Sequence, residues 1–134
     1  MRGTLVDTNV LLDIVTDDVH WADWSERSLD AATLRGPVFI NDVIYAELSV
    51  RFARIEELDN MIDKATLVHA QMPRSGLFLA AKAFRRYRAA RGQRTGVLPD
   101  FFIGAHAAVA ELILLTRDAA RYRNYFPMVQ LVAP

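Results

Sequence analysis

The sequence predicts an α/β fold in which a mainly parallel central sheet is flanked by helices. Short apolar runs, typical of strands buried on both faces, occur at residues 4–6, 38–40 and 112–115. Segments with helical spacing of apolar residues separate these runs, and strands that alternate with helices favour parallel pairing. Two of the runs end in polar residues, with Asp7 after the first and Thr116 after the third. We therefore expect one α/β sandwich.

The first elements follow from apolar spacing and from the residues that start and stop helices. A helix through residues 10–12 follows the first strand, and a second helix covers 21–34 before Gly36 ends it. After the second strand, Asn41 or Asp42 can accept hydrogen bonds from the first free N–H groups of a third helix. We interpret Asp42 as a helix cap.

The rest of the chain continues this alternation. The elements expected there are a charged helix at 54–64, a short strand at 65–68, a long helix at 75–91, a helix that begins at Asp100, the strand at 112–115 and a last strand at 129–132. One side of the long helix carries apolar residues at helical spacing: Leu77, Ala80, Ala81, Phe84 and Tyr87. We find no internal repeat or linker, so residues 1–134 are expected to form a single domain.

Composition narrows the classes of protein. The 134 residues include no cysteine, which excludes disulfides and thiolate metal sites. We find no signal peptide and no apolar stretch of membrane-spanning length, so a soluble, cytoplasmic protein is expected. The net charge is zero, yet residues 1–63 carry −8 and residues 64–134 carry +8. Because 14 of the 16 basic residues are arginine, a local phosphate-binding surface fits this composition.

Four carboxylates are expected to meet at one edge of the sheet: Asp7, Glu47, Asp100 and Asp118. Asp7 and Asp118 follow buried strands, and such folds bind ligands beyond the carboxyl ends of their strands. Converging carboxylates repel one another unless a cation lies between them. Oxygen ligands without cysteine or paired histidines favour Mg²⁺ or Mn²⁺, and such an ion can activate water for attack on a phosphodiester. We expect all four to be catalytic through the metal that they bind.

Each carboxylate also has a structural interpretation. Asp100 can simply cap a helix, and Asp118 can cap a short helix at 119–123. Glu47 alone is most simply a solvated helix residue. Asp7 is different, because a carboxylate beside a buried strand needs a partner. The combination of the four favours function over these separate roles.

Polar and basic residues near the carboxylates have expected supporting roles. Thr8, Asn9 and Thr116 are predicted to position the metal ligands or the substrate. Three arginines are candidates for contacts with phosphate: Arg88, Arg91 and Arg117. The first two fall toward the apolar side of the long helix, at the end that is nearest in sequence to Asp100.

These motifs resemble the PIN-domain ribonucleases, in particular the VapC toxins of VapBC toxin–antitoxin modules. The resemblance runs from LVDTNVLLD through VIYAELSV to LPDFFIGAHAAVAELILLTRDAARYRNYFP, so it spans the chain. It implies a PIN-like three-layer sandwich. By position, it makes the same four carboxylates the metal ligands and makes Asn9 and Thr116 the accessory polar groups. Residues 51–73 carry no distinctive motif, so no particular RNA is predicted.

The resemblance also implies a function and partners. Its members cleave single-stranded or looped RNA with Mg²⁺ or Mn²⁺, form homodimers and are silenced by a small VapB-type antitoxin. The antitoxin lays its C-terminal arm into the active-site groove, and the complex reaches operator DNA only through the antitoxin. We therefore expect a partly apolar, arginine-lined groove beside the carboxylates. Four aromatic residues are expected to contribute an interaction surface: Trp21, Trp24, Phe101 and Phe102. A core that buries all four is the alternative.

Two other functions compete with an endoribonuclease toxin of a type II toxin–antitoxin system. One is a PIN-like nuclease of RNA processing or DNA repair with no toxin role. The other is a phospho-accepting signalling domain, which requires adjacent acidic residues early in the chain and a lysine after a late strand. Here Thr8 and Asn9 follow Asp7, and Arg117 precedes Asp118, which argues against the signalling domain.

Overall fold

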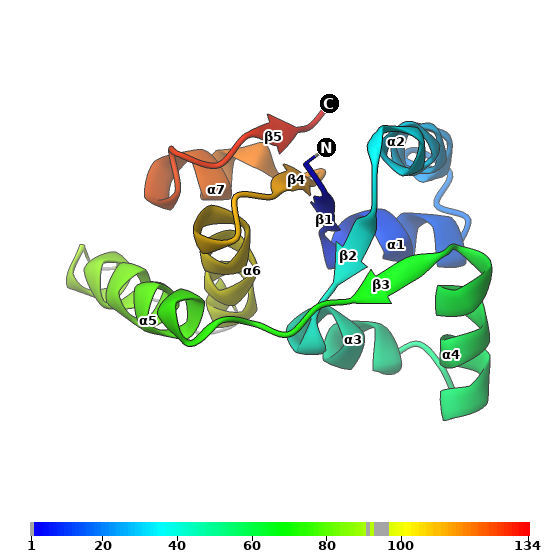
Figure 1. Cartoon of the computed structure of the whole chain (residues 1–134), viewed down its shortest axis with the longest axis horizontal. Coiled ribbons are helices and arrows are strands. Elements are labelled where there is room, and N and C mark those ends of the chain that lie inside the picture. The colour runs from blue at the N-terminus through cyan, green and yellow to red at the C-terminus, as the bar shows by residue number, and fades with distance from the viewer. Residues whose placement is uncertain (1, 91, 93–96) are drawn as a thin grey trace.

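Five short strands form one parallel sheet in the order β3-β2-β1-β4-β5 (Figure 1). The computed structural model describes residues 2–90, 92 and 97–134. The strands are β1 (Thr4–Val6), β2 (Val38–Ile40), β3 (Leu67–His69), β4 (Ile113–Leu115) and β5 (Leu131–Val132). Within the described residues all four strand pairings are parallel. The α/β fold with a mainly parallel sheet is therefore confirmed.

The strand β1 lies at the centre of the sheet and is buried on both faces. Leu5 lies opposite Phe39 of β2 on one side and Leu114 of β4 on the other. Neither Leu5 nor Val6 has exposed surface. A strand with neighbours on both edges and helices on both faces contacts only apolar surroundings, which explains why its sequence is a continuous apolar run.

Helices in the described part of the chain connect and cover the strands. They are α1 (Thr8–Val15), α2 (Ala22–Arg35), α3 (Asp42–Ser49), α4 (Ile55–Lys64), α5 (Arg74–Ala89), α6 (Leu98–Val109) and α7 (Ala119–Tyr125). Figure 1 shows α1 and α2 on one side of the sheet and α5 and α6 on the other, which gives the expected three layers. Crossovers between parallel strands are right-handed, so the face that a connecting helix covers depends on the direction in which the chain moves along the sheet. The chain moves from β1 to β3 in one direction and then returns past β1 to β4, which places helices on both faces. No described helix combines the length and apolarity needed to cross a membrane.

The strand order reverses at β1, because β2 and β3 lie on one side of it and β4 and β5 on the other. Beyond the carboxyl ends of β1 and β4 the connecting segments leave toward opposite faces. Folds of this type bind ligands in the crevice that forms at such a point. Asp7 follows β1, and its N–H donates to the carbonyl oxygen of Leu115 at 2.8 Å. The two polar segments that end apolar runs in the sequence therefore meet at this crevice.

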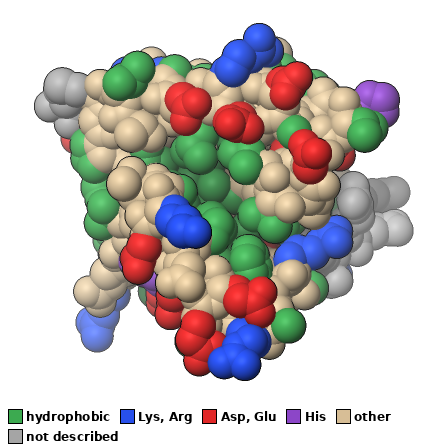
Figure 2. Space-filling model, turned by 90° about the vertical axis from the view of Figure 1, so that its right-hand side faces the viewer, with side chains coloured by type: hydrophobic (Ala, Val, Ile, Leu, Met, Phe, Trp, Pro, Cys, Tyr) green, Lys and Arg blue, Asp and Glu red, His purple; other side chains and the backbone are tan. Residues whose placement is uncertain are grey.

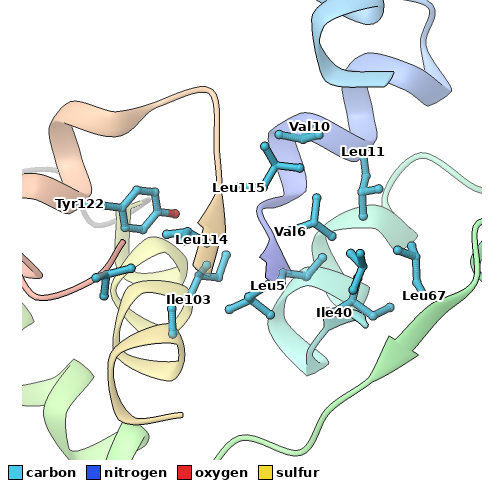
Figure 3. Packing of buried hydrophobic residues seen from close by; sticks show 14 of the residues in the cluster. Leu5, Val6, Val10, Leu11, Ile40, Leu67, Ile103, Leu114, Leu115 and Tyr122 are labelled. Atoms are coloured by element: carbon cyan, nitrogen blue, oxygen red, sulfur yellow. The ribbon is translucent and has the colours of Figure 1, made fainter. Parts of the chain in front are cut away.

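A continuous cluster of buried apolar residues joins the sheet to its helices (Figure 3). Leu5 of β1 and Leu114 of β4 lie between Ile103 of α6 and Leu11 of α1, and none of these four is more than 2% exposed. Burial of each such side chain contributes about 1.5–3 kcal/mol to stability. This packing holds the carboxyl ends of β1 and β4 in fixed positions beside each other.

The cap of α3 is Asn41 and not Asp42. The side-chain oxygen of Asn41 accepts a hydrogen bond from the N–H of Ile44 at 3.0 Å. Its amide nitrogen lies 3.0 Å from Nδ1 of the buried His106, which links α3 to α6. Asp42 lies in the first turn of the helix and pairs instead with His69 at 2.6 Å. The interpretation of Asp42 as the cap was wrong, because Asn41 is the residue in the extended conformation before the helix.

The start of α6 also differs from the prediction. The helix begins at Leu98, two residues before Asp100. Pro99 fits the first turn because the N–H group that it lacks would have no partner there. Asp100 therefore does not cap the helix, and its carboxylate faces other partners. A smaller difference concerns β3, which covers 67–69 rather than the predicted 65–68.

The buried face of α5 is rotated from the predicted one. Gly76 and Ala80 face the core, whereas Leu77 is 43% exposed and Ala81 is exposed. The helix packs closely on α6, and a Cβ atom added at Gly76 would lie 3.2 Å from Cγ2 of Val109. Small residues face α6 because only they allow the two helices to pack so closely. The apolar spacing in the sequence favours larger residues, so it predicted a face of α5 next to the buried one.

Phe101 is a core residue and not part of an interaction surface. It is 2% exposed. Its ring lies 5.2–6.0 Å, between centroids, from four others: Phe84, Tyr87, Tyr125 and Phe126. Phe102 is partly buried against the same core, while Trp21 and Trp24 stay partly exposed and pack edge to face. The expected surface of four aromatic residues is therefore wrong for Phe101.

Candidate active site

Asp7 lies immediately beyond β1, with only 3% of its surface exposed. Its Oδ1 accepts a hydrogen bond from the N–H of Thr8 at 2.8 Å. Its Oδ2 accepts hydrogen bonds from the hydroxyl groups of Thr116 at 2.8 Å and Tyr122 at 2.9 Å, and from the side-chain amide of Asn9 at 3.3 Å. All of these donors are uncharged, so they orient the carboxylate without neutralising it.

Burial raises the pKa of Asp7 to about 6. The hydrogen bonds from Thr116, Tyr122 and Thr8 act in the opposite direction, whereas the negative charge of Asp100 adds to the increase. Burial of a charge is costly unless an opposite charge lies nearby. A cation beside Asp7 would remove that cost, so the environment of Asp7 favours cation binding.

Glu47 projects from α3 toward the same point. Its Oε1 accepts a hydrogen bond from the hydroxyl of Thr8 at 2.6 Å. Burial raises the pKa of Glu47, the hydrogen bond from Thr8 lowers it, and the negative charge of Asp100 raises it. Thr8 therefore contacts two of the predicted carboxylates, one through its backbone N–H and the other through its hydroxyl.

Asp100 reaches the site from the first turn of α6. Its Oδ2 accepts a hydrogen bond from the guanidinium of Arg121, and its Oδ1 lies 3.5 Å from the hydroxyl of Tyr122. Burial raises the pKa of Asp100, and Arg121 lowers it. The buried Tyr122 hydroxyl thus lies between Asp7 and Asp100, and burial beside these two charges raises the pKa of Tyr122 well above its usual value.

Asp118 occupies the rim of the site. It is the residue before α7, but its side chain makes no capping hydrogen bond. Its N–H donates to the hydroxyl oxygen of Thr116 at 3.0 Å, and its Oδ2 lies 3.8 Å from Arg121. The side chain of Asp118 is 48% exposed. The structure therefore brings Asp118 near the other carboxylates through Arg121, and not into contact with them.

A pocket of about 410 Å³ opens at these residues. Its lining consists of Asp7, Thr8, Asn9, Leu12, Glu47, Val50, Arg51, Asp100 and Arg121. Three of the four predicted carboxylates thus share one pocket with two of the predicted accessory residues. The lining is also partly apolar and includes two arginines, which matches the groove expected beside the carboxylates.

The donor chemistry of this pocket fits Mg²⁺ or Mn²⁺. It offers carboxylate and hydroxyl oxygen atoms and no sulfur, which are the ligands that these hard cations prefer. Among the described residues, no three acidic or histidine side chains lie close enough together to hold a metal ion in their present positions. An ion at Asp7 would therefore require Glu47 and Asp100 to change their side-chain positions.

Of the predicted phosphate-contacting arginines, Arg88 and Arg117 are not part of the pocket lining. Arg88 is exposed on α5, and Arg91 lies outside the described residues. Arg117 donates from Nε to Oδ2 of Asp13 at 2.8 Å and from a terminal nitrogen to Oδ1 at 3.0 Å. Ser25 donates to the same Asp13 at 2.8 Å. Arg117 therefore already has a carboxylate partner, and a phosphate contact by any of the three stays a prediction.

The sequence motifs do not indicate two residues of the site, Arg121 and Tyr122, or the structural role of a third residue, Asp13. Asp13 is 3% exposed and pairs with Arg117 outside the pocket. A weak signal existed for the other two, because Arg121 and Tyr122 follow Asp118 by three and four residues and therefore share a helix face with it.

Comparisons with known proteins place this chain in a family. A model of the PIN domain matches residues 4–127. A comparison with curated proteins finds no match. Among solved structures, the chain is similar to a chain of VapBC2 from Rickettsia felis bound to a DNA fragment from its promoter, with 17% identity, a TM-score of 0.72 and 97% of each chain covered.

Two further solved structures show the same likeness. One is a toxin–antitoxin complex from Klebsiella pneumoniae, with 20% identity and a TM-score of 0.69 over 97% of this chain and 96% of that chain. The other is VapBC-1 from nontypeable Haemophilus influenzae, with 13% identity and a TM-score of 0.69 over the same shares. At such identities the likeness demonstrates the fold. Since the family model covers most of the sequence, the chain belongs to the PIN domain family.

Proposed function

We propose that this protein is a Mg²⁺- or Mn²⁺-dependent endoribonuclease of the VapC toxin type, formed by a single domain over residues 1–134. One observation carries the proposal: Asp7 is buried without a cationic partner among the described residues, in a pocket that Glu47 and Asp100 also line. Such a site favours a divalent cation, and the PIN domain family supports nuclease chemistry.

The residues of the site would have two kinds of role, metal binding and orientation of the metal-binding carboxylates. Asp7 would anchor the metal, with Glu47, Asp100 and the rim residue Asp118 as further carboxylates. Thr8 orients Glu47, and the hydroxyl groups of Thr116 and Tyr122 aim Oδ2 of Asp7 (both hydrogen bonds are shorter than 3 Å). A bound Mg²⁺ or Mn²⁺ supplies a water of lowered pKa and neutralises charge on the phosphodiester.

RNA cleavage by the purified protein tests this proposal. We expect products with 5′-phosphate and 3′-hydroxyl ends in Mg²⁺ or Mn²⁺, and no cleavage in excess EDTA. The matched control is the Asp7→Asn protein, which keeps the shape of the side chain. Undiminished cleavage in EDTA, or products with 2′,3′-cyclic phosphate ends, would contradict the metal-dependent mechanism.

The toxin role includes a small antitoxin as partner, and operator DNA would be reached through that antitoxin. The similar solved structures support this, since they are VapBC and toxin–antitoxin complexes, one of them with promoter DNA. The arm of the antitoxin would enter the pocket at the carboxylates, and an apolar groove of about 510 Å³ between α1, α2 and α4 offers a second surface for the same partner. Figure 2 shows hydrophobic side chains gathered in the middle of this face, with acidic and basic side chains around them.

We also propose a cytoplasmic homodimer. Exposed apolar residues of α5, Leu77 at 43% and Phe78 at 67%, offer a surface for a second copy. The test is induction of the chain with and without the product of an adjacent small gene, followed by size-exclusion chromatography with light scattering. A free monomer that neither binds that product nor slows growth would contradict the toxin role and leave a PIN-like nuclease of RNA processing or DNA repair.

A further inference from the structure

We propose that Arg121 is an exchangeable counterion of the active site, which pairs with Asp100 when no metal is bound and with a phosphate of the RNA when a metal is bound. This inference rests on the proposed function, because it assumes a divalent cation and a nucleic-acid substrate. It adds a residue that binds substrate and that the sequence motifs did not indicate.

The pairing of Arg121 is the first observation. Its guanidinium donates to Oδ2 of Asp100 and lies 3.8 Å from Oδ2 of Asp118. Asp100 lines the pocket with Asp7 and Glu47, so Arg121 occupies a position where a cation satisfies the carboxylates. A divalent cation at Asp100 would repel the guanidinium that donates to Oδ2 of the same carboxylate. Metal binding therefore disfavours the pair between Asp100 and Arg121.

The mobility that exchange requires follows from exposure. The side chain of Arg121 is 30% exposed and that of Asp100 is 18% exposed, so the guanidinium can leave toward solvent without passing through the core. Arg117 has a similarly exposed side chain, at 32%, but its partner and contacts provide the contrast. Its guanidinium makes two hydrogen bonds to Asp13, whose side chain is only 4% exposed, and it also lies over the ring of Trp21 at 5.2 Å. Of the two arginines, Arg121 is the one that can change partners.

Phosphate is the partner that the chemistry selects. A released guanidinium at the edge of the pocket presents a planar fork of N–H donors, which matches the oxygen atoms of a phosphodiester. Arg51 lies in the same pocket lining, so the pocket would hold two arginines beside the metal. Exchange would also link metal binding to RNA binding, since metal binding frees Arg121 to bind RNA. In linked equilibria of this kind, the metal increases the affinity for RNA by the same factor by which RNA increases the affinity for the metal.

Metal binding by Arg121→Gln tests the first half of the exchange. Isothermal titration of metal-free protein with Mn²⁺ should show about five- to tenfold tighter binding in Arg121→Gln than in wild type, because the competitor is gone. The matched control is Arg123→Gln, which removes an exposed arginine from the same helix and should leave Mn²⁺ affinity unchanged. Unchanged or weaker binding in Arg121→Gln would overturn the inference.

Oligonucleotide binding tests the second half. A fluorescent single-stranded DNA oligonucleotide serves as a phosphate-bearing probe without the 2′-hydroxyl of RNA. In saturating Mn²⁺, Arg121→Gln should bind it about tenfold more weakly than wild type, and in EDTA the two proteins should bind it similarly. Equal affinities in Mn²⁺ would overturn the exchange even if the metal titration agrees.

The same measurements separate this inference from the proposed function. If wild type binds Mn²⁺ and cleaves RNA but Arg121→Gln behaves like Arg123→Gln, only the role of Arg121 is wrong. If neither wild type nor Arg121→Gln binds Mn²⁺ and wild type cleaves no RNA, the proposed metal-dependent function is wrong and the inference falls with it.

Discussion

Asp7 and Asp13 lie six residues apart in the segment DTNVLLD, and each is 3% exposed. Their surroundings differ. Asp13 accepts two hydrogen bonds from the guanidinium of Arg117 and one from Ser25. Asp7 accepts only from uncharged groups. The two side chains are therefore equally buried, but only the charge of Asp13 is neutralised, by Arg117.

The difference separates a structural carboxylate from one that is prepared for a ligand. Asp13 joins α1 to α2 and to the loop after β4, and its charge is balanced within the fold. The charge of Asp7 has no such balance, and the cost of burying that charge raises the pKa of Asp7 to about 6. A buried carboxylate that the protein orients but does not neutralise marks a cation site more clearly than burial alone.

The largest expected effect is on catalysis. Asp7→Asn should reduce RNA cleavage by roughly 10³-fold, because the proposed metal site would lose a carboxylate ligand, while circular dichroism remains that of a folded protein. Asp13→Asn is the comparison, and it should keep cleavage at temperatures where it stays folded. If folded Asp13→Asn is as inactive as Asp7→Asn, the two carboxylates belong to one site and the distinction between them fails.

The next largest effect is on stability, and it concerns the ion pair between Arg117 and Asp13. Arg117→Ala should lower the free energy of unfolding in urea by about 3 kcal/mol, because it leaves the buried Asp13 without a counterion. Arg123→Ala removes an exposed arginine nearby and should change stability by less than about 0.5 kcal/mol. Similar stabilities for the two variants would mean that the pair with Asp13 has little structural value.

The pH dependence of stability sharpens the comparison. The pKa of Asp7 is about 6 in the folded protein and near 3.8 when unfolded, so the folded state binds the extra proton. That contribution to stability is fully present below pH 3.8 and is lost as pH rises through 6. In EDTA, the stability of Asp7→Asn relative to wild type should therefore increase by about 2.5 kcal/mol between pH 4 and pH 8.

Urea unfolding of both proteins across this range measures that difference. Burial lowers the pKa of His106, so its contribution is present above its usual value and is lost as pH falls. Because His106 titrates in both proteins, its effect cancels in the comparison. A relative stability that stays constant with pH would show that Asp7 is not the group whose charge the fold tolerates poorly.

The smallest expected effect comes from one of the uncharged donors. Tyr122→Phe removes the hydroxyl that donates to Oδ2 of Asp7 and should cost about 1 kcal/mol of stability in EDTA at pH 8. The cost should be smaller at pH 4, where Asp7 is protonated and needs fewer donors. Tyr125→Phe, in the aromatic cluster, is the matched control. A loss at Tyr122 that does not depend on pH would indicate packing alone.

Local sequence patterns determined most of the fold. Apolar runs such as Leu5-Val6 and Ile113 to Leu115 indicated buried strands because a central parallel strand contacts apolar groups on both faces. The residues that follow two of those strands indicated the crevice, since the carboxyl ends of parallel strands share one edge. These features depend on neighbours in sequence, so the sequence alone indicates them.

Pairings between distant side chains were decided only by the tertiary structure. The partner of Asp13 is 104 residues away, and that of Asp100 is 21 residues away on another helix. Sequence spacing can place a carboxylate at the crevice, but it does not say which arginine reaches it. That depends on how α6, α7 and α1 pack around the sheet and on the side-chain directions that this packing allows. For this reason Asp7 was predicted as a site residue from the sequence, whereas Arg121 and Arg117 acquired their different roles only in the folded chain.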